Sequence, residues 1–250
     1  MVAILLIGDE ILSGSVRESN LHLMLTTLNG IGYDVGEVRI VRDDPAAIAE
    51  AFRSLRDRYE YLLSAGGIGP THDDMTIDAA VSAFGVPAEE HPEMLAFLKT
   101  RYGTPLSPMV RKMASLPRGT RVLGCSEGHW PVIRWKNVFI LPGLPRALQD
   151  KMHRIVDILP HRATVTSAEL YLNVDESEFA DWLQRESDDT PGVTIGSYPV
   201  FGDYDYVTRL VVRGVDESSV RAVAHRLEGY VAPRGWLVRR GGDLWGEAHS

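Results

Sequence analysis

The first 150 residues alternate between short apolar runs and amphipathic stretches of helical periodicity. Val2–Ile7 is continuously apolar and ends at Gly8, and Tyr61–Ser64 is a similar run that ends in a glycine-rich loop. Apolar runs bounded by turn residues are typical of strands buried on both faces. Because helical patterns follow each run, the alternation predicts parallel strands joined by right-handed crossovers. We therefore expect an α/β domain with a doubly wound, mostly parallel sheet in three layers.

The pattern changes after Pro160. We expect strands at Val165–Val174, Val193–Val200, Tyr206–Arg213 and Trp236–Arg239, and helices at Glu176–Glu186 and Val220–Val231. This β-α-β-β-α-β order predicts a small α/β-plait (KH-like) domain. The chain would then consist of a first domain over 1–162 and a second over 163–250. The second would carry a hairpin with the sequence Gly196-Ser197-Tyr198-Pro199.

Charge and hydropathy exclude several kinds of partner. Lys and Arg number 26 against 34 Asp and Glu, a net charge of −8, whereas sequence-independent nucleic-acid binding needs an excess of cations. The first apolar run has six residues, against roughly 20 for a membrane-spanning helix. We expect a soluble cytoplasmic protein with no nucleic-acid or membrane partner. Cys125 is the single cysteine, and His129 lies nearby, but no glycine elbow frames them as a nucleophile.

The loop Ala65–Thr76 is the most informative part of the sequence. It follows a predicted strand and opens a predicted helix over Asp74–Phe84, so it lies at the ligand-binding edge of such a sheet. Its glycines allow backbone N–H groups to approach a phosphate, aided by the helix N-terminus. Asp73 and Asp74 would repel a bare phosphate unless a divalent cation bridges them. Alternatively, Thr71 or Asp73 simply caps the helix.

Two more acidic pairs follow predicted strands. Asp9 and Glu10 come after the first strand, and Asp43 and Asp44 come after the second. Asp44 can also be explained as the cap of a helix that starts at Pro45. Carboxylates gathered at one sheet edge repel each other unless a cation joins them, which favours a site for Mg²⁺, Mn²⁺ or Co²⁺. The positions of the three pairs do not decide which acid of each pair would bind the cation.

Four segments together resemble a known family. They are GDEILSG…ESN (8–20), the DD before PAAI (43–44), AGGIGPTHDDMT (65–76) and NVFILPGLP (137–145). They resemble the MoaB/Mog-type molybdopterin-binding fold, within it the CinA N-terminal branch, and most of all the molybdopterin-binding-like domain of FAD synthases. The match covers about residues 1–160. The GSYP segment is similar to the small domain that follows in CinA and FAD-synthase proteins.

The resemblance implies an activity and a site. It implies metal-dependent cleavage of a dinucleotide pyrophosphate such as ADP-ribose or FAD, with K⁺ as a further candidate ion and no flavin or nicotinamide as redox cofactor. Carried over from the family, the essential carboxylates fall on Asp43 and Asp74, and the metal ligands that the resemblance implies are Asp9, Asp43 and Asp74. The candidate residues for binding a nucleotide or pterin are Gly8, Asp9, Glu10, Asn20, Gly66, Gly67, Ile68, Gly69, Pro70, Thr71, Asp73, Thr76, Pro142 and Gly143.

Two alternatives remain open. One is a molybdopterin adenylyltransferase, although the GPTHDD sequence resembles the CinA branch more than the Mog form. The other is a non-catalytic nucleotide- or pterin-binding module, since binding and cleavage use the same loop. The chain ends at Ser250, so we expect neither the deamidase activity of full-length CinA nor FAD synthesis. By analogy with the family, we expect a homo-oligomer.

Overall fold

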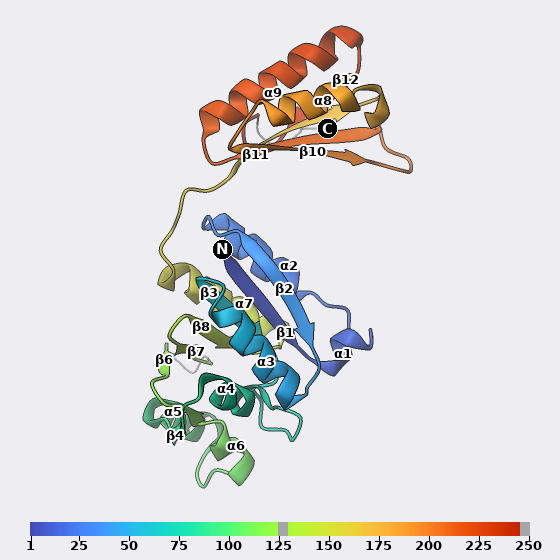
Figure 1. The fold of residues 1–250 in the computed structure, drawn as a ribbon. Coiled ribbons are helices and arrows are strands. Elements are labelled where there is room, and N and C mark those ends of the chain that lie inside the picture. The colour runs from blue at the N-terminus through green and yellow to red at the C-terminus, as the bar shows by residue number, and fades with distance from the viewer. Residues whose placement is uncertain (125–129, 246–250) are drawn as a thin grey trace. The chain divides into compact units, whose positions relative to one another are not determined.

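The computed structural model describes residues 1–124 and 130–245 (Figure 1). Cys125 and His129 lie outside the described residues. The chain divides into two compact units, Met1–Arg162 and Ala163–Ser250. Among the described residues, no helix is long and apolar enough to cross a membrane.

The first unit is built on a mostly parallel sheet. In the described residues this sheet has six strands in the order β2-β1-β3-β8-β7-β6. The strands are β1 (Val2–Ile7), β2 (Val35–Val41), β3 (Tyr61–Ala65), β6 (Arg121–Leu123), β7 (Val132–Trp135) and β8 (Val138–Leu141). Only β7 runs against its neighbours, so the predicted doubly wound α/β domain is confirmed.

Helices cover both faces of this sheet (Figure 1). The helices of this unit are α1 (Asp9–Leu12), α2 (Asn20–Gly30), α3 (Pro45–Arg56), α4 (Thr76–Phe84), α5 (Pro92–Tyr102), α6 (Pro108–Lys112) and α7 (Pro145–Ile158), of which α2 and α7 pack on one face and α3 and α4 on the other. Two short strands, β4 (Ala88–Glu90) and β5 (Ser115–Pro117), form a separate antiparallel pair. Neither this pair nor α1 was expected, because three or four residues carry no periodicity to detect.

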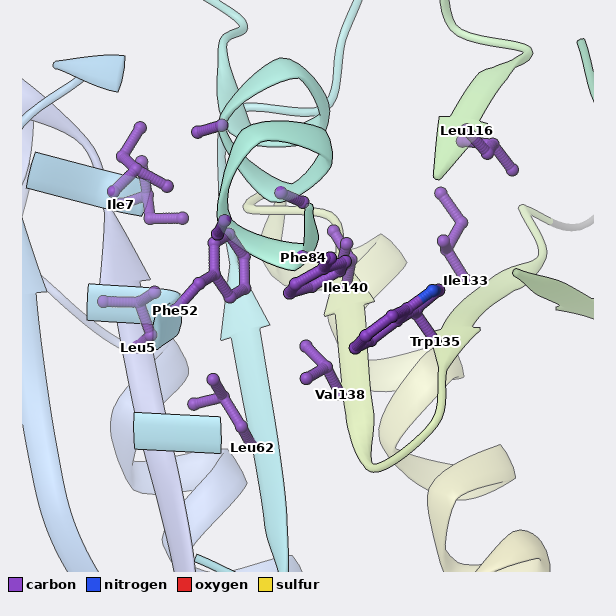
Figure 2. Close-up of a cluster of buried hydrophobic side chains, with 14 of the residues drawn as sticks. Leu5, Ile7, Phe52, Leu62, Phe84, Leu116, Ile133, Trp135, Val138 and Ile140 are labelled. Atoms are coloured by element: carbon purple, nitrogen blue, oxygen red, sulfur yellow. The ribbon is translucent and has the colours of Figure 1, made fainter. Parts of the chain in front are cut away.

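The first unit has one hydrophobic core on each face of its sheet, and strand β1 contributes side chains to both. Ile4 and its alternate neighbours pack toward α2 and α7, whereas Leu5 and Ile7 pack toward α3 and α4. Figure 2 shows the second of these cores, in which Phe84 stacks on Trp135 with 4.1 Å between ring centroids. Because every side chain of β1 is buried, the continuously apolar run is explained by packing on two faces.

The second unit is a four-stranded antiparallel sheet with helices on one face. Its elements are β9 (Thr166–Leu172), α8 (Ala180–Asp188), β10 (Val193–Pro199), β11 (Thr208–Gly214), α9 (Glu217–Val231) and β12 (Leu237–Gly241), with 3₁₀ turns η1 (Glu176–Glu178) and η2 (Ala232–Arg234). The strand order β10-β11-β9-β12 confirms the predicted plait. The helix expected from Glu176 is interrupted at Phe179, whose side chain is buried in the core.

Candidate functional site

The carboxyl ends of β1, β3 and β8 meet at Gly66. Its N–H donates a 3.2 Å hydrogen bond to the carbonyl of Leu141, and its φ is +114°. A Cβ at this position would lie 2.1 Å from the carbonyl oxygen of Ile7, and one on Gly143 would lie 3.1 Å from the Cα of Gly66. The three strand ends can approach this closely only because the loop residues lack side chains.

Thr76 closes the glycine loop from within. Its hydroxyl donates a 2.8 Å hydrogen bond to the carbonyl of Gly66, and its N–H donates to the carbonyl of Gly67 at 3.0 Å. Thr76 is fully buried. This corrects the expectation that the Thr76 hydroxyl contacts a ligand, because the hydroxyl donates its hydrogen bond to the backbone of the loop. The helix α4 also begins here, two residues later than predicted.

Asp74 shapes the far side of the same loop. Its Oδ2 accepts hydrogen bonds from the N–H of Thr71 at 2.9 Å and from the Thr71 hydroxyl at 2.5 Å. A Cβ on Gly69 would lie 2.5 Å from that same oxygen. Asp74 lines a small pocket of about 20 Å³ together with Lys112 and Met109 of the α6 segment. Its observed contacts are therefore internal to the loop.

An acidic cleft lies on the other side of the loop. It has a volume of about 620 Å³ and is lined by Asp9, Glu10, Ser13, Ser15, Arg42, Asp43, His72, Asp73 and Met75. The predicted convergence of carboxylates at the sheet edge is therefore observed for Asp9, Glu10, Asp43 and Asp73. Asp74 does not line this cleft. Its expected place beside Asp9 and Asp43 is taken by Asp73, because consecutive residues of the loop face opposite sides.

Asp43 is a carboxylate of the cleft whose pKa is raised. Its Oδ2 accepts a 2.9 Å hydrogen bond from the N–H of Asp9. Burial raises the pKa of Asp43, and the negative charges of Glu10, Asp9 and Asp73 raise it further against that hydrogen bond. Its other oxygen, Oδ1, lies 3.6 Å from where a Cβ on Gly67 would be. Asp43 thus joins the acidic cleft to the glycine loop.

The donor chemistry of the cleft suits a hard cation in part. Carboxylate oxygens are the ligands that Mg²⁺ prefers, and Asp43 is surrounded by other acids. Within the described residues, however, no three or more His, Cys, Asp or Glu side chains form a group that could hold a metal ion by themselves. Mg²⁺ commonly uses one or two carboxylates and completes its shell with water and substrate phosphates. The cleft fits a cation held in that shared way.

The remaining expected residues lie around this edge. The Asn20 amide donates a 2.7 Å hydrogen bond to the carbonyl of Gly143, tying α2 to the turn after β8. The N–H of Gly8 continues the β1–β2 pairing. Pro142 is buried, so its role is to turn the chain. Ile68 and Pro70 are half-buried in the loop. Asp44 caps α3 by accepting the N–H of Ala47 at 2.7 Å, as the simpler explanation predicted.

Sequence reasoning missed two side chains that line the cleft, Arg42 and His72. The Arg42 guanidinium lies 3.5 Å from Asp9 Oδ1, and its side chain is 71% exposed. The His72 side chain is 95% exposed at the rim of the cleft. Arg42 precedes Asp43 and His72 precedes Asp73 in the sequence, and this position next to a candidate aspartate was the signal that could have identified them. Such side chains in loops usually remain in solvent, so the sequence pattern did not distinguish these two.

The fold and this strand-end site define a class of protein. Residues 3–161 match the family described as a probable molybdopterin binding domain. The chain belongs to that family. Residues 164–238 match the family described as the FAD synthase middle domain. The expected resemblance to MoaB/Mog-type domains followed by the small domain of FAD synthases is therefore confirmed.

Individual relatives agree with this placement. A probable FAD synthase of Caenorhabditis elegans is 28% identical over 97% of this chain and 52% of its own length. A CinA-like protein of Myxococcus xanthus is 32% identical over 66% of this chain and 40% of its own. A crystal structure of a CinA protein with unknown function from Thermoplasma acidophilum is 31% identical, with a TM-score of 0.57, covering 62% of this chain and 96% of that one. The chain spans about half the length of the two curated relatives named here.

Proposed function

We propose that the first unit hydrolyses the phosphoanhydride bond of a dinucleotide such as ADP-ribose or FAD. The observation that carries the proposal is the position of Asp43. This carboxylate is partly desolvated, lies among three other acids, and adjoins a glycine loop that suits a phosphate. The FAD-synthase names of the relatives fit a nucleotide ligand.

In this proposal, separate groups of the chain bind the phosphates, hold a cation and position the loop. The backbone N–H groups of Gly67, Ile68 and Gly69 donate to the phosphate oxygens, since those of Gly66 and Thr76 already donate to the carbonyls of Leu141 and Gly67. Asp9 and Asp73 of the cleft would hold a divalent cation, which would neutralise charge that develops on the phosphoryl oxygens. Asp74 keeps Thr71 and the loop in place through its two hydrogen bonds.

Asp43 is the base in this proposal. A carboxylate whose pKa is raised is a stronger base than an ordinary aspartate, and Asp43 can accept the proton of the attacking water. The water oxygen forms a bond to one phosphorus, the bridging P–O bond breaks, and two phosphomonoesters leave. Arg42 at the rim of the cleft is placed to offset negative charge on the departing group.

The test is release of AMP by the purified full chain. ADP-ribose and FAD would each be incubated with Mg²⁺, Mn²⁺ or Co²⁺, with and without K⁺, and ATP plus molybdopterin would be run in parallel. We expect metal-dependent AMP release that falls at least about a hundredfold in Asp43→Asn. Asp57→Asn, an exposed aspartate at the end of α3, is the matched control and should remain fully active.

Three outcomes would contradict the proposal. Undiminished turnover in a folded Asp43→Asn protein would remove Asp43 from the chemistry. Formation of an adenylylated pterin would make the protein an adenylyltransferase. Saturable binding of the dinucleotides without AMP release under any metal would make the first unit a binding module.

A further inference from the structure

The sheet of the second unit has one face free of helices. Alternate side chains such as Leu170 and Val212 pack beneath the helices on one side. The intervening residues point to the opposite face, over which Figure 1 shows no helix among the described residues of this unit. This open face is made of side chains from all four strands.

Tyrosine and arginine alternate across this face. In the strand register Tyr198 of β10 pairs with Arg209 of β11, Arg209 pairs with Tyr171 of β9, and Tyr171 pairs with Arg239 of β12. The hairpin between β10 and β11 adds two more rings. Tyr206 lies 4.8 Å from Tyr171, and Tyr204 lies 5.7 Å from Tyr206, between centroids. We call Tyr171, Tyr198, Tyr204, Tyr206, Arg209 and Arg239 the tyrosine–arginine face.

The planar groups of this face are held in fixed positions. Glu169 binds the Arg209 guanidinium at 3.0 Å and accepts the Tyr171 hydroxyl at 2.5 Å. The Arg239 guanidinium lies over the Tyr171 ring at 4.1 Å and is held by Asp205 at 2.5 Å. Because these planes are fixed before any ligand arrives, little side-chain entropy remains to be lost on binding.

Tyr198 forms an accessible platform on strand β10. A Cβ on Gly196 would lie 2.8 Å from the ring and hydroxyl of Tyr198, so the ring lies against bare backbone. The residue remains 49% exposed. Val211, the aliphatic neighbour opposite Gly196, is only 2% exposed. The face therefore presents rings and guanidinium groups rather than the aliphatic surface typical of a dimer interface.

The charges of this face favour a small ligand over a polyanion. Arg209 and Arg239 are already paired with Glu169 and Asp205, so they add little net attraction for a phosphate backbone. Arg213 lies on the same face, two residues beyond Val211 along β11, and is exposed. Among the described residues it has no ion-pair partner. The face thus offers several stacking surfaces and one unpaired cation.

We propose that the tyrosine–arginine face binds a mononucleotide, with its base stacked on Tyr198 and its phosphate bound by Arg213. Aromatic rings and guanidinium planes stack on any nucleobase, and a free guanidinium binds a phosphate in bidentate geometry. The inference is independent of the function proposed for the first unit, because every residue it uses belongs to the second.

The probe is flavin mononucleotide, whose fluorescence is quenched when its ring stacks on tyrosine, titrated into the full chain. AMP serves as a competitor, ribose 5-phosphate as a ligand without a ring, and a ten-residue oligothymidylate as a polyanion. We expect saturable quenching that AMP relieves and ribose 5-phosphate does not. Tyr198→Ala and Arg213→Gln should each weaken binding roughly tenfold. Tyr102→Ala, which removes an exposed tyrosine of the first unit, should leave it unchanged.

Several results would overturn the proposal. Absence of saturable quenching at millimolar probe, or equal binding by parent and both variants, would show that no mononucleotide binds this face. Tighter binding of the oligothymidylate, lost in Tyr198→Ala, would make the occupant a single-stranded nucleic acid. Concentration-dependent self-association that Tyr198→Ala abolishes would make it a second copy of the chain.

Discussion

The N–H of Asp9 donates a 2.9 Å hydrogen bond to Oδ2 of Asp43, which ties the end of β1 to the loop after β2. This bond orients the Asp43 carboxylate and favours its charged form, but it does not outweigh the effects that raise the pKa of Asp43. Burial and the acids Glu10, Asp9 and Asp73 all favour its protonated form. A charge held where its surroundings disfavour it is characteristic of functional sites, where stability is sacrificed for activity.

Asp43→Asn should therefore stabilise the protein at neutral pH. Since the folded-state pKa of Asp43 is raised above its ordinary 3.8, its protonated form favours the folded state. That contribution is complete below the unfolded-state pKa and is lost as pH rises through the folded-state value. The side chain is still partly solvated, so we expect a gain of only about 0.5 kcal/mol at pH 7.

Urea unfolding of parent and variant at pH 7 and pH 3 measures this difference. Asp57→Asn, an exposed control, should change neither midpoint. A variant that is less stable than the parent at pH 7 would mean that Asp43 is stabilised by a charge partner rather than opposed by its neighbours.

The gathering of carboxylates was predictable, whereas the choice between Asp73 and Asp74 was not. Parallel strands place their carboxyl ends at one edge, so Asp9 and Asp43 had to be neighbours once their strands were recognised. Which of two consecutive aspartates enters the cleft depends on the hydrogen bonds that Thr71 makes to Asp74. Those bonds depend on the backbone path of the loop, and sequence periodicity does not predict the path of an irregular loop.

The same limit explains Thr76 and the tyrosine–arginine face. The sequence predicted a helix from Asp74, whereas α4 begins at Thr76, and the direction of the Thr76 hydroxyl depends on the carbonyl of Gly66. The alternation of Tyr198, Arg209, Tyr171 and Arg239 requires three strand pairings with known register. One-residue shifts would move each side chain to the other face of the sheet.

Gly66→Ala should destabilise the first unit strongly. A Cβ there would lie 2.1 Å from the Ile7 carbonyl oxygen, and φ is +114°, which L-residues rarely adopt. Backbone must move at the point where three strands end, and we expect a loss of roughly 2–4 kcal/mol in the free energy of unfolding. Chemical denaturation measures it.

The matched control is Gly229→Ala. Gly229 lies in α9, and a Cβ there would meet nothing within 4 Å. Because alanine is a better helix former than glycine, this variant should gain about 0.5–1 kcal/mol. Equal losses in both variants would show that the close approach at Gly66 is not what demands glycine.

Asp216 should give the second unit an acid-sensitive helix cap. It accepts hydrogen bonds from the N–H and hydroxyl of Ser219 and from the hydroxyl of Ser218, which lower its pKa to about 2. Because the folded-state pKa lies below the ordinary 3.8, this stabilisation is complete above that pH and is lost as pH falls through about 2.

Thermal unfolding between pH 7 and pH 2 tests the cap. Asp216→Ala should lower the Tm at pH 7, and the gap to the parent should close on acidification. Asp216→Asn keeps an accepting oxygen and should lie between the two at pH 7. A gap between Asp216→Ala and the parent that persists unchanged to pH 2 would show that the cap does not depend on the ionised carboxylate.

Substitutions of Asp74 and Asp43 should change different kinetic constants if Asp74 positions the loop while Asp43 takes part in the reaction. Asp74→Ala removes the acceptor of both Thr71 bonds, so the loop loosens and KM should rise about tenfold, with kcat less affected. Asp74→Asn retains an oxygen for the Thr71 N–H and should stay close to the parent. Asp43→Asn should instead lower kcat with little change in KM. If Asp74→Asn abolishes turnover as completely as Asp74→Ala while dinucleotide binding survives, the charge of Asp74 acts on the substrate directly, and its role is catalytic.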